Sequence, residues 1–212
     1  MICVSLAEKT FKDCLKALEE VEFAEIRMDK MDVTAEEIST LFSSHSKLIA
    51  TCRPGFQKKD KRLELLLAAV HAGAAYIDIE MESDEDFRNT IMSKAKKMGC
   101  RTIISYHNFK GTPDRQELNQ IVQNCFNDGA DLVKVACKVH NNMENVRLIS
   151  LLEDVRPIIV IGLGEEGKKT RFIAPLLGSP FTYASLSKGK ETAEGQMDRE
   201  TLAHFLTTLE NV

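Results

Sequence analysis

DLVKVA, residues 131–136, is a short apolar run with one lysine at its centre. Its length and its valines are typical of a β-strand. Side chains alternate across a strand, so Val133 and Val135 share one face and Lys134 points the other way. We expect the valine face to pack against helices. Lysine is among the residue types least often buried, so Lys134 on the inner face needs a chemical reason.

Seven other short apolar runs occur along the chain, and segments with helical periodicity separate them. The full set is ICVSLA (2–7), FAEIRMD (23–29), KLIATCR (47–53), AYIDIE (75–80), RTIISYHNF (101–109), DLVKVACKV (131–139), PIIVIGLG (157–164) and FTYASL (181–186). Eight strand–helix units predict an α/β protein with a single (β/α)8 TIM barrel domain over residues 1–212. That length is close to the lower limit of about 200 residues for this fold. The first run begins at residue 2, so we expect a barrel that lacks an N-terminal hairpin extension.

A doubly wound open sheet is the alternative architecture, because it also alternates strands and helices. A dinucleotide-binding sheet of that type would carry a glycine-rich phosphate fingerprint after its first strand. The sequence LAEKT at 6–10 is not such a fingerprint.

The composition limits the classes of function. Hydrophobic residues make up 43% of the chain, and the net charge is −4, which argues against a nucleic-acid binder. The apolar runs are too short to span a bilayer, and the N-terminus lacks the pattern of a signal peptide. Six cysteines without a CxxC pair indicate reduced, buried thiols. We therefore expect a cytoplasmic protein that has no membrane or nucleic-acid partner.

Polar residues share the inner face of several predicted strands, mostly near the C-terminal ends where barrel enzymes keep their chemistry. They are Ser5, Glu25, Arg27, Asp29, Thr51, Arg53, Asp78, Glu80, Ser105 and His107, together with Lys134. Burying so many polar groups is costly unless they are paired or used. For Asp29, Asp78 and Glu80, a salt-bridge network that only balances nearby arginines is an equally good interpretation.

Lys134 and His107 are the pair most suited to covalent and proton-transfer chemistry. A lysine attacks a carbonyl only as the free amine, which a low-dielectric site and neighbouring cations such as Arg27 and Arg53 favour. The resulting imine acidifies the adjacent C–H, and a histidine can remove that proton. The pair therefore predicts Schiff-base chemistry on a ketone, and its spacing fits an aldolase as well as a dehydratase.

A resemblance to a known family selects between these reactions. Seven pieces, in order along nearly the whole chain, resemble motifs of the type I 3-dehydroquinate dehydratases. They are EIRMD (25–29), TCR (51–53), DIE (78–80), SYHNF (105–109), VKVA (133–136), GKKTR (167–171) and TAEGQ (192–196). The family is a lyase family of the shikimate pathway, which serves aromatic amino acid biosynthesis.

The resemblance implies roles for individual residues. Lys134 would form the imine, and His107 would act as general base and then as general acid. Arg171 would hold the substrate carboxylate, and the loop at 187–196 would act as a lid. The other substrate-binding residues would be Ser5, Glu25, Arg27, Arg53, Thr192 and Gln196. The resemblance implies no metal or organic cofactor, and it suggests a homodimer.

Three departures from the family pattern stand out. Gln57 occupies a position where the family usually has a glutamate that orients the histidine, which implies either a less basic histidine or another carboxylate, such as Glu80, in that part. Ile161 stands where a methionine is usual, and the N-terminal hairpin is absent. Two other functions remain open at this stage: another Schiff-base lyase such as a class I aldolase, and a non-catalytic binding protein.

Other candidate residues favour plainer interpretations. We expect His45, His71, His140 and His204 to lie at the surface or in satisfied packing positions. The glycines of GLGEEG at 162–167 are interpreted as room for substrate, because the GK[ST] ending of a phosphate loop is missing. KKDKR at 58–62 is interpreted as a solvated helix start.

Overall fold

The computed structural model describes residues 1–55 and 58–210. The chain divides into two compact units. The N-terminal unit comprises Ser5–Ile103, and the C-terminal unit comprises Met1–Val4 together with the chain from Ile104 onward. Strands β1 (Ile2–Leu6) and β5 (Arg101–Asn108) each contribute residues to both units.

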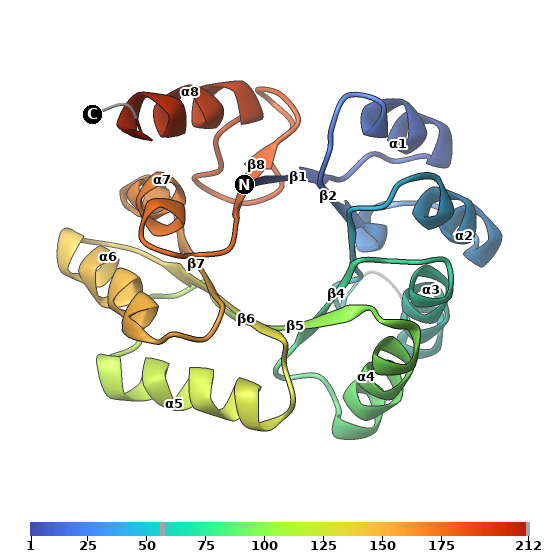
Figure 1. Ribbon diagram of the computed structural model, residues 1–212, viewed down its shortest axis with the longest axis horizontal. Helices are drawn as coiled ribbons and strands as arrows, with labels where there is room; N and C mark the ends of the chain where they lie inside the picture. Colours follow the sequence, from blue (N-terminus) through green and yellow to red (C-terminus); the bar gives the residue numbers. More distant parts are fainter. Residues whose placement is uncertain (56–57, 211–212) are drawn as a thin grey trace. The chain divides into compact units, whose positions relative to one another are not determined.

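Strands and helices alternate in the N-terminal unit, as the apolar runs predict. Its remaining elements are α1 (Phe11–Leu18), β2 (Ala24–Arg27), η1 (Met28–Lys30), α2 (Ala35–Ser44), β3 (Leu48–Thr51), α3 (Lys59–His71), β4 (Tyr76–Glu80) and α4 (Glu85–Met98). The strands pair in parallel, with Glu25 opposite Ile49 and Thr51 opposite Asp78. Figure 1 shows α2, α3 and α4 side by side along one side of these strands.

The C-terminal unit repeats the alternation. It contains α5 (Arg115–Asn127), β6 (Leu132–Lys138), α6 (Asn142–Ile149), η2 (Ser150–Glu153), β7 (Ile158–Leu163), η3 (Glu166–Lys169), α7 (Thr170–Leu176), β8 (Thr182–Ser185) and α8 (Arg199–Glu210). Strands β6 and β7 pair in parallel, with Lys134 opposite Ile159. Helix α7 packs between α6 and α8 (Figure 1).

Side-chain caps mark the starts of α1, α2, α4, α5 and α6. Thr34 forms a complete capping box with Glu37, as the spacing predicts. Helix α4 is capped by Asp84, because its carboxylate accepts the backbone N–H of Phe87. Likewise Asp114 caps α5, because its carboxylate accepts the backbone N–H of Glu117.

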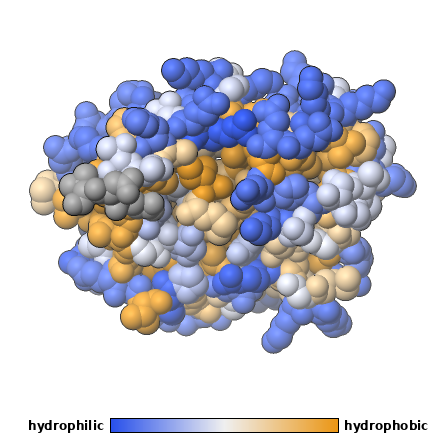
Figure 2. Space-filling view, turned by 45° about the horizontal axis from the view of Figure 1, so that its top comes forward, coloured by the Kyte–Doolittle hydropathy of each residue, from blue (hydrophilic) through white to orange (hydrophobic). Residues whose placement is uncertain are grey.

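Strands β6 and β7 of the C-terminal unit are buried on both faces. All six residues of β7 are buried, and six of the seven residues of β6 are buried. All six cysteines are buried and none forms a disulfide, as expected of reduced, buried thiols. Hydrophilic residues predominate on the face shown in Figure 2, with smaller hydrophobic areas between them. Among the described residues, the structure contains no helix long and apolar enough to cross a membrane.

Candidate active site

Lys134 lies in the middle of β6 and is 6% exposed. The alternation of β6 places it on the face opposite Val133 and Val135, which are both fully buried. Its Nζ lies 4.1 Å from the centre of the Tyr183 ring, which β8 supplies. Tyr183 is itself 4% exposed. The lysine is therefore held in a dry environment against the face of an aromatic ring.

His107 lies near the C-terminal end of β5, the strand next to β6. It is half-buried, and its ring stacks on the ring of Phe109 with centroids 6.1 Å apart. Phe109 is 75% exposed. Asn108, between the two, accepts backbone N–H groups from Lys110 and Gly111, which orders the turn after the strand. The histidine thus lies at a strand end with one ring face covered.

Arg171 is the largest fully buried side chain of the described residues, at 1% exposed. It belongs to α7, and Nη1 donates to the backbone carbonyl of Tyr183 at 3.3 Å. Nη2 donates to the carbonyl of Glu194 at 3.5 Å, while Nε has no partner among the described residues. No carboxylate pairs with this guanidinium in the described part of the chain. Burial lowers the pKa of Arg171 to about 10.

A close approach of two glycines places the N-terminus of α7. Thr170 Oγ1 accepts the backbone N–H of Gly162 at 2.7 Å and donates to the carbonyl of Gly167 at 2.9 Å. A Cβ on Gly162 would lie 2.7 Å from Cα of Gly167. The two glycines therefore allow backbone contact between β7 and η3, which is a different role from the room for substrate that the sequence suggests.

Thr192 and Gln196 come together in the loop after β8. The side-chain oxygen of Gln196 accepts from the backbone N–H of Thr192 at 2.7 Å and from its hydroxyl at 3.1 Å. Gly195 adopts a φ of +74°, and a Cβ there would lie 2.3 Å from the carbonyl oxygen of Gly164. The loop at 187–196 therefore rests directly on the segment that follows β7.

Glu25 in the N-terminal unit is a buried carboxylate that accepts two hydroxyl hydrogen bonds. Ser5 donates to Oε2 at 2.6 Å, and Thr51 donates to Oε1 at 2.9 Å. Three adjacent strands supply these residues, as the predicted inner face requires. Thr51 was placed on the inner face by its alternation with Arg53, and its contact with Glu25 supports that placement.

Arg27 and Asp29 form a two-pronged ion pair. Nε and Nη2 of Arg27 lie 2.9 and 2.7 Å from the two carboxylate oxygens. Asp29 lies in η1 and not in the strand, so the chain turns to bring the carboxylate back onto the arginine. Burial alone would lower the pKa of Arg27, but the hydrogen bond to Asp29 and the charges of Glu25 and Asp29 raise it.

Arg53 joins the two carboxylates of β4. Nη2 lies 3.0 Å from Asp78, and Nη1 lies 2.8 Å from Glu80. Burial opposes the charged form, yet the charges of Asp78, Glu80 and Glu25 raise the pKa of Arg53 above its ordinary value. Asp29, Asp78 and Glu80 therefore each pair with an arginine, as the balancing interpretation of these carboxylates predicts.

Arg62 completes this network and departs from the sequence interpretation of KKDKR. It is 7% exposed, its Nη2 lies 3.1 Å from Glu80, and its guanidinium covers the ring of Phe87 at 4.9 Å. Lys58, Lys59 and Asp60 are exposed, as a solvated helix start requires. Arg62 turns inward because it lies one helical turn further on, beside the buried face of α3.

The sequence pattern did not predict site roles for Tyr183 and Phe109. Tyr183 alternates with Phe181 in the run FTYASL, and that aromatic pattern was the available signal. Gln57 lies outside the described residues, so its predicted role stays a prediction. Within the C-terminal unit, the structure links Lys134 and Arg171 through Tyr183. Within the N-terminal unit, it groups Glu25 with Ser5 and builds the arginine–carboxylate pairs.

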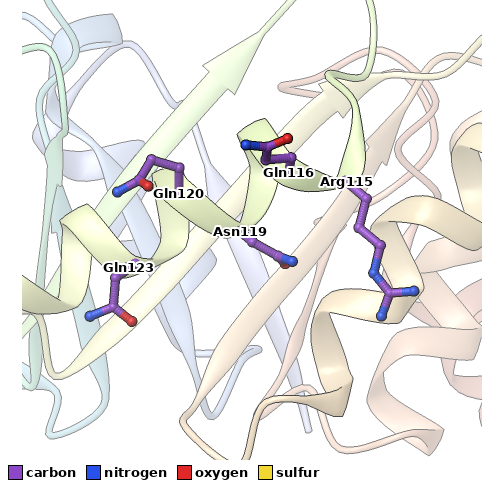
Figure 3. Close-up of a pocket in the computed structure, with 5 residues that line it drawn as sticks. All are labelled: Arg115, Gln116, Asn119, Gln120 and Gln123. Atoms are coloured by element: carbon purple, nitrogen blue, oxygen red, sulfur yellow. The ribbon is translucent and has the colours of Figure 1, made fainter.

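Other sites carry less chemistry. Figure 3 shows a pocket on α5 lined by Arg115, Gln116, Asn119, Gln120 and Gln123. Gln120 and Gln123 donate to asparagines one helical turn away, and Arg115 pairs with Glu153. The described residues contain no group of three or more His, Cys, Asp or Glu side chains suited to a metal ion.

The remaining histidines have ordinary environments, as the sequence predicts. His45 contacts the carbonyl of Val21 through Nε2 at 2.9 Å, and His140 contacts the carbonyl of Lys110 at 2.8 Å. His71 and His204 are exposed on α3 and α8.

Comparisons with known proteins agree on one family. The family model for type I 3-dehydroquinase matches residues 2–212. The 3-dehydroquinate dehydratase of Methanococcoides burtonii is 33% identical over 99% of this chain and 94% of its own length. That of Methanocaldococcus jannaschii is 33% identical over 95% of this chain and 96% of its own.

Solved structures share the fold. A type I 3-dehydroquinate dehydratase from Clostridium difficile, with covalently modified comenic acid, has a TM-score of 0.88 at 23% identity, over 99% of this chain and 92% of that one. The 3-dehydroquinate dehydratase from Aquifex aeolicus has a TM-score of 0.82 at 26% identity, over 98% of both chains. These similarities confirm the predicted (β/α)8 barrel fold class.

Proposed function

Because the chain belongs to the type I 3-dehydroquinase family, we propose that it converts 3-dehydroquinate to 3-dehydroshikimate and water through an imine at Lys134. Family membership makes the chain an enzyme, a hydro-lyase. The class I aldolase and the non-catalytic binding protein are both set aside on that ground. We place the reaction in the shikimate pathway, where it serves aromatic amino acid biosynthesis.

One observation supports this substrate more than any other. Arg171 is a fully buried guanidinium with no carboxylate partner among the described residues. A buried cation without a counter-ion is costly, so it fits a site completed by an anionic ligand. Tyr183 connects this guanidinium to Lys134. A substrate with a carboxylate for Arg171 and a ketone for Lys134 matches that pairing.

The proposed reaction balances without a cofactor. Nζ of Lys134 attacks the C3 ketone, and loss of water gives an imine whose nitrogen carries a proton. His107 removes a proton from C2, and the electron pair moves to nitrogen as an enamine. The protonated His107 then gives its proton to the departing C1 hydroxyl, which leaves as water. Hydrolysis of the product imine restores the amine.

The remaining residues bind and enclose the substrate in this proposal. Arg171 takes the carboxylate as a two-pronged donor, which suits a guanidinium. Glu25, Arg27 and Arg53 bind ring hydroxyls and the carbonyl end, with Asp29, Asp78 and Glu80 fixing the arginines. Ser5, Thr192 and Gln196 add hydrogen bonds, and the loop at 187–196 excludes water. On the resemblance, we also propose a cytoplasmic homodimer.

Turnover of 3-dehydroquinate tests the proposal directly. The unaltered protein should produce the conjugated enone of 3-dehydroshikimate, which is followed by its ultraviolet absorbance. Lys134→Ala should abolish turnover and keep the fold, while His107→Ala should form imine and eliminate water very slowly. A fully active Lys134→Ala variant would refute the mechanism. A normal rate in His107→Ala would move the base to another residue.

A further inference from the structure

One contact of Lys134 has no role in the proposed reaction. Nζ lies 4.1 Å from the centroid of the Tyr183 ring. The face of an aromatic ring carries the negative part of its quadrupole, so it attracts a cation in that position. In the proposed reaction the nitrogen at this place is the protonated nitrogen of an imine. The ring face therefore lies where the reaction needs a positive charge.

The Tyr183 ring is held firmly in this orientation. The side chain is 4% exposed, and the ring of Phe181 packs against it at 62° with centroids 5.6 Å apart. The backbone carbonyl of Tyr183 accepts from Nη1 of Arg171 at 3.3 Å, which fixes the main chain of the same residue. A cation–π contact is strongest where water is excluded, and this one is buried on both sides.

Two neighbouring influences oppose a positive charge on the imine. Lys134 is buried, and burial disfavours any charged form. The guanidinium of Arg171 contacts the same tyrosine and is of like sign. An imine that loses its proton is a poor electron sink, and it would stall the removal of the C2 proton. The face of an aromatic ring acts against both influences because it favours the cation.

We propose that the ring face of Tyr183 is a catalytic group, which stabilises the protonated imine at Lys134. The inference rests on the proposed function and deepens it. The proton stays on nitrogen throughout this step: when His107 takes the C2 proton, the electron pair of that C–H bond moves to nitrogen, which becomes neutral as the enamine forms. The aromatic face carries this role, and the phenolic hydroxyl is not required for it.

Stepwise fluorination separates the ring face from its shape. Phenylalanine, trifluorophenylalanine and pentafluorophenylalanine at position 183 weaken the quadrupole in steps and keep nearly the same ring. Two quantities are measured at one fixed pH. One is kcat, and the other is the protonated fraction of the imine that Lys134 forms with 3-dehydroshikimate, which is read from its deuterium-sensitive C=N stretch. Tyr183→Phe should stay within about two-fold of the unaltered protein. Both quantities should then fall together, by about ten-fold at pentafluorophenylalanine.

Tyr183→Leu provides a second variant by ordinary mutagenesis, and it should match the pentafluorinated protein. Position 126 on α5 provides a control, because the ring of Phe126 lies 4.2 Å from the guanidinium of Arg156. Pentafluorophenylalanine there should leave kcat unchanged. Thermal unfolding of each variant checks that the fold is intact.

Two results would overturn the inference: no change across the fluorinated series, or a loss in Tyr183→Phe as large as that in Tyr183→Leu. Borohydride trapping of the unaltered protein keeps the two claims apart. Absence of a Lys134 adduct would refute the proposed function and this inference with it. An adduct combined with a flat fluorinated series would refute only the role of Tyr183.

Discussion

Lys138 forms an ion pair with Glu194, with Nζ 2.6 Å from Oε1. The pair joins the end of β6 to the loop that follows β8. The backbone carbonyl of Glu194 also accepts from the N–H of Gly164 at 3.2 Å, so the loop is held at this residue by side chain and main chain. Lys138 follows Lys134 by four residues on the same strand. If the loop acts as the lid, this ion pair favours its closed position.

Glu194→Gln should therefore raise KM for 3-dehydroquinate by about two- to five-fold, because an exposed ion pair of this kind contributes modestly. The KM of the unaltered protein should rise with salt, and that of the variant should depend on salt less. Steady-state kinetics at several salt concentrations measure both effects. Glu64→Gln breaks the exposed pair with Lys61 on α3 and serves as the control. Equal salt dependence in all three proteins would exclude a role for the pair in closure.

Arg171→Met should raise stability and abolish substrate binding. Because the folded-state pKa of about 10 lies below the ordinary value, the charged side chain destabilises the folded protein below about pH 10. That penalty is present in full at neutral pH and would begin to fall only as pH rises above about 10. We expect a gain of about 1 kcal/mol at neutral pH, or about 2–4 °C in Tm. A Tm below that of the unaltered protein would show that Arg171 is already compensated without substrate.

Arg62→Met is the matched comparison, since Arg62 is buried to a similar degree but pairs with Glu80. Removal of one partner from a buried pair typically costs about 3 kcal/mol. Arg62→Met should therefore lower Tm while Arg171→Met raises it. Opposite changes in Tm for the two variants would show that Arg62 belongs to a structural ion pair and that Arg171 is a cation that awaits a ligand.

Gly162→Ala should destabilise the protein by about 1–3 kcal/mol or more, because the added Cβ would lie 2.7 Å from backbone atoms of Gly167. The same change should raise KM. The hydrogen bonds of the Thr170 hydroxyl to Gly162 and Gly167 hold the start of α7, where Arg171 follows Thr170. Urea unfolding and steady-state kinetics measure the two effects. Gly111→Ala is the control, as its Cβ would meet only the His140 ring at 4.0 Å. A Gly162→Ala variant as stable as Gly111→Ala would contradict the close-approach role.

The strands were predictable from the sequence because buried parallel strands read as short apolar runs between amphipathic segments. All eight runs contain a strand of the structure. Helix starts were less certain, since Ser83 and Asp84 are both good caps and only the backbone geometry selects Asp84. The apolar run at 23–29 extends beyond β2, because the strand ends at Arg27 and Met28 and Asp29 belong to η1.

The polar partners of the candidate site were partly predictable. Strand alternation places Glu25, Arg53 and Lys134 on inner faces, and the structure finds their contacts there. Arg62 could not be found in this way, because a helical arginine within a charged run normally faces water. Its burial depends on the three-dimensional position of Glu80, a partner 18 residues away. The contact between Lys134 and Tyr183 likewise depends on tertiary packing, which no local pattern encodes.

Imine formation at Lys134 is tested by borohydride reduction of the protein mixed with 3-dehydroquinate, with peptide mass spectrometry to locate the adduct. We expect a reduced adduct on Lys134 with the mass of bound 3-dehydroshikimate, which is one water less than that of bound 3-dehydroquinate. No adduct is expected on Lys138 of the same strand. Lys134→Arg should remove the adduct. An adduct on a different lysine, or no adduct in an unaltered protein that turns over the substrate, would contradict imine formation at Lys134.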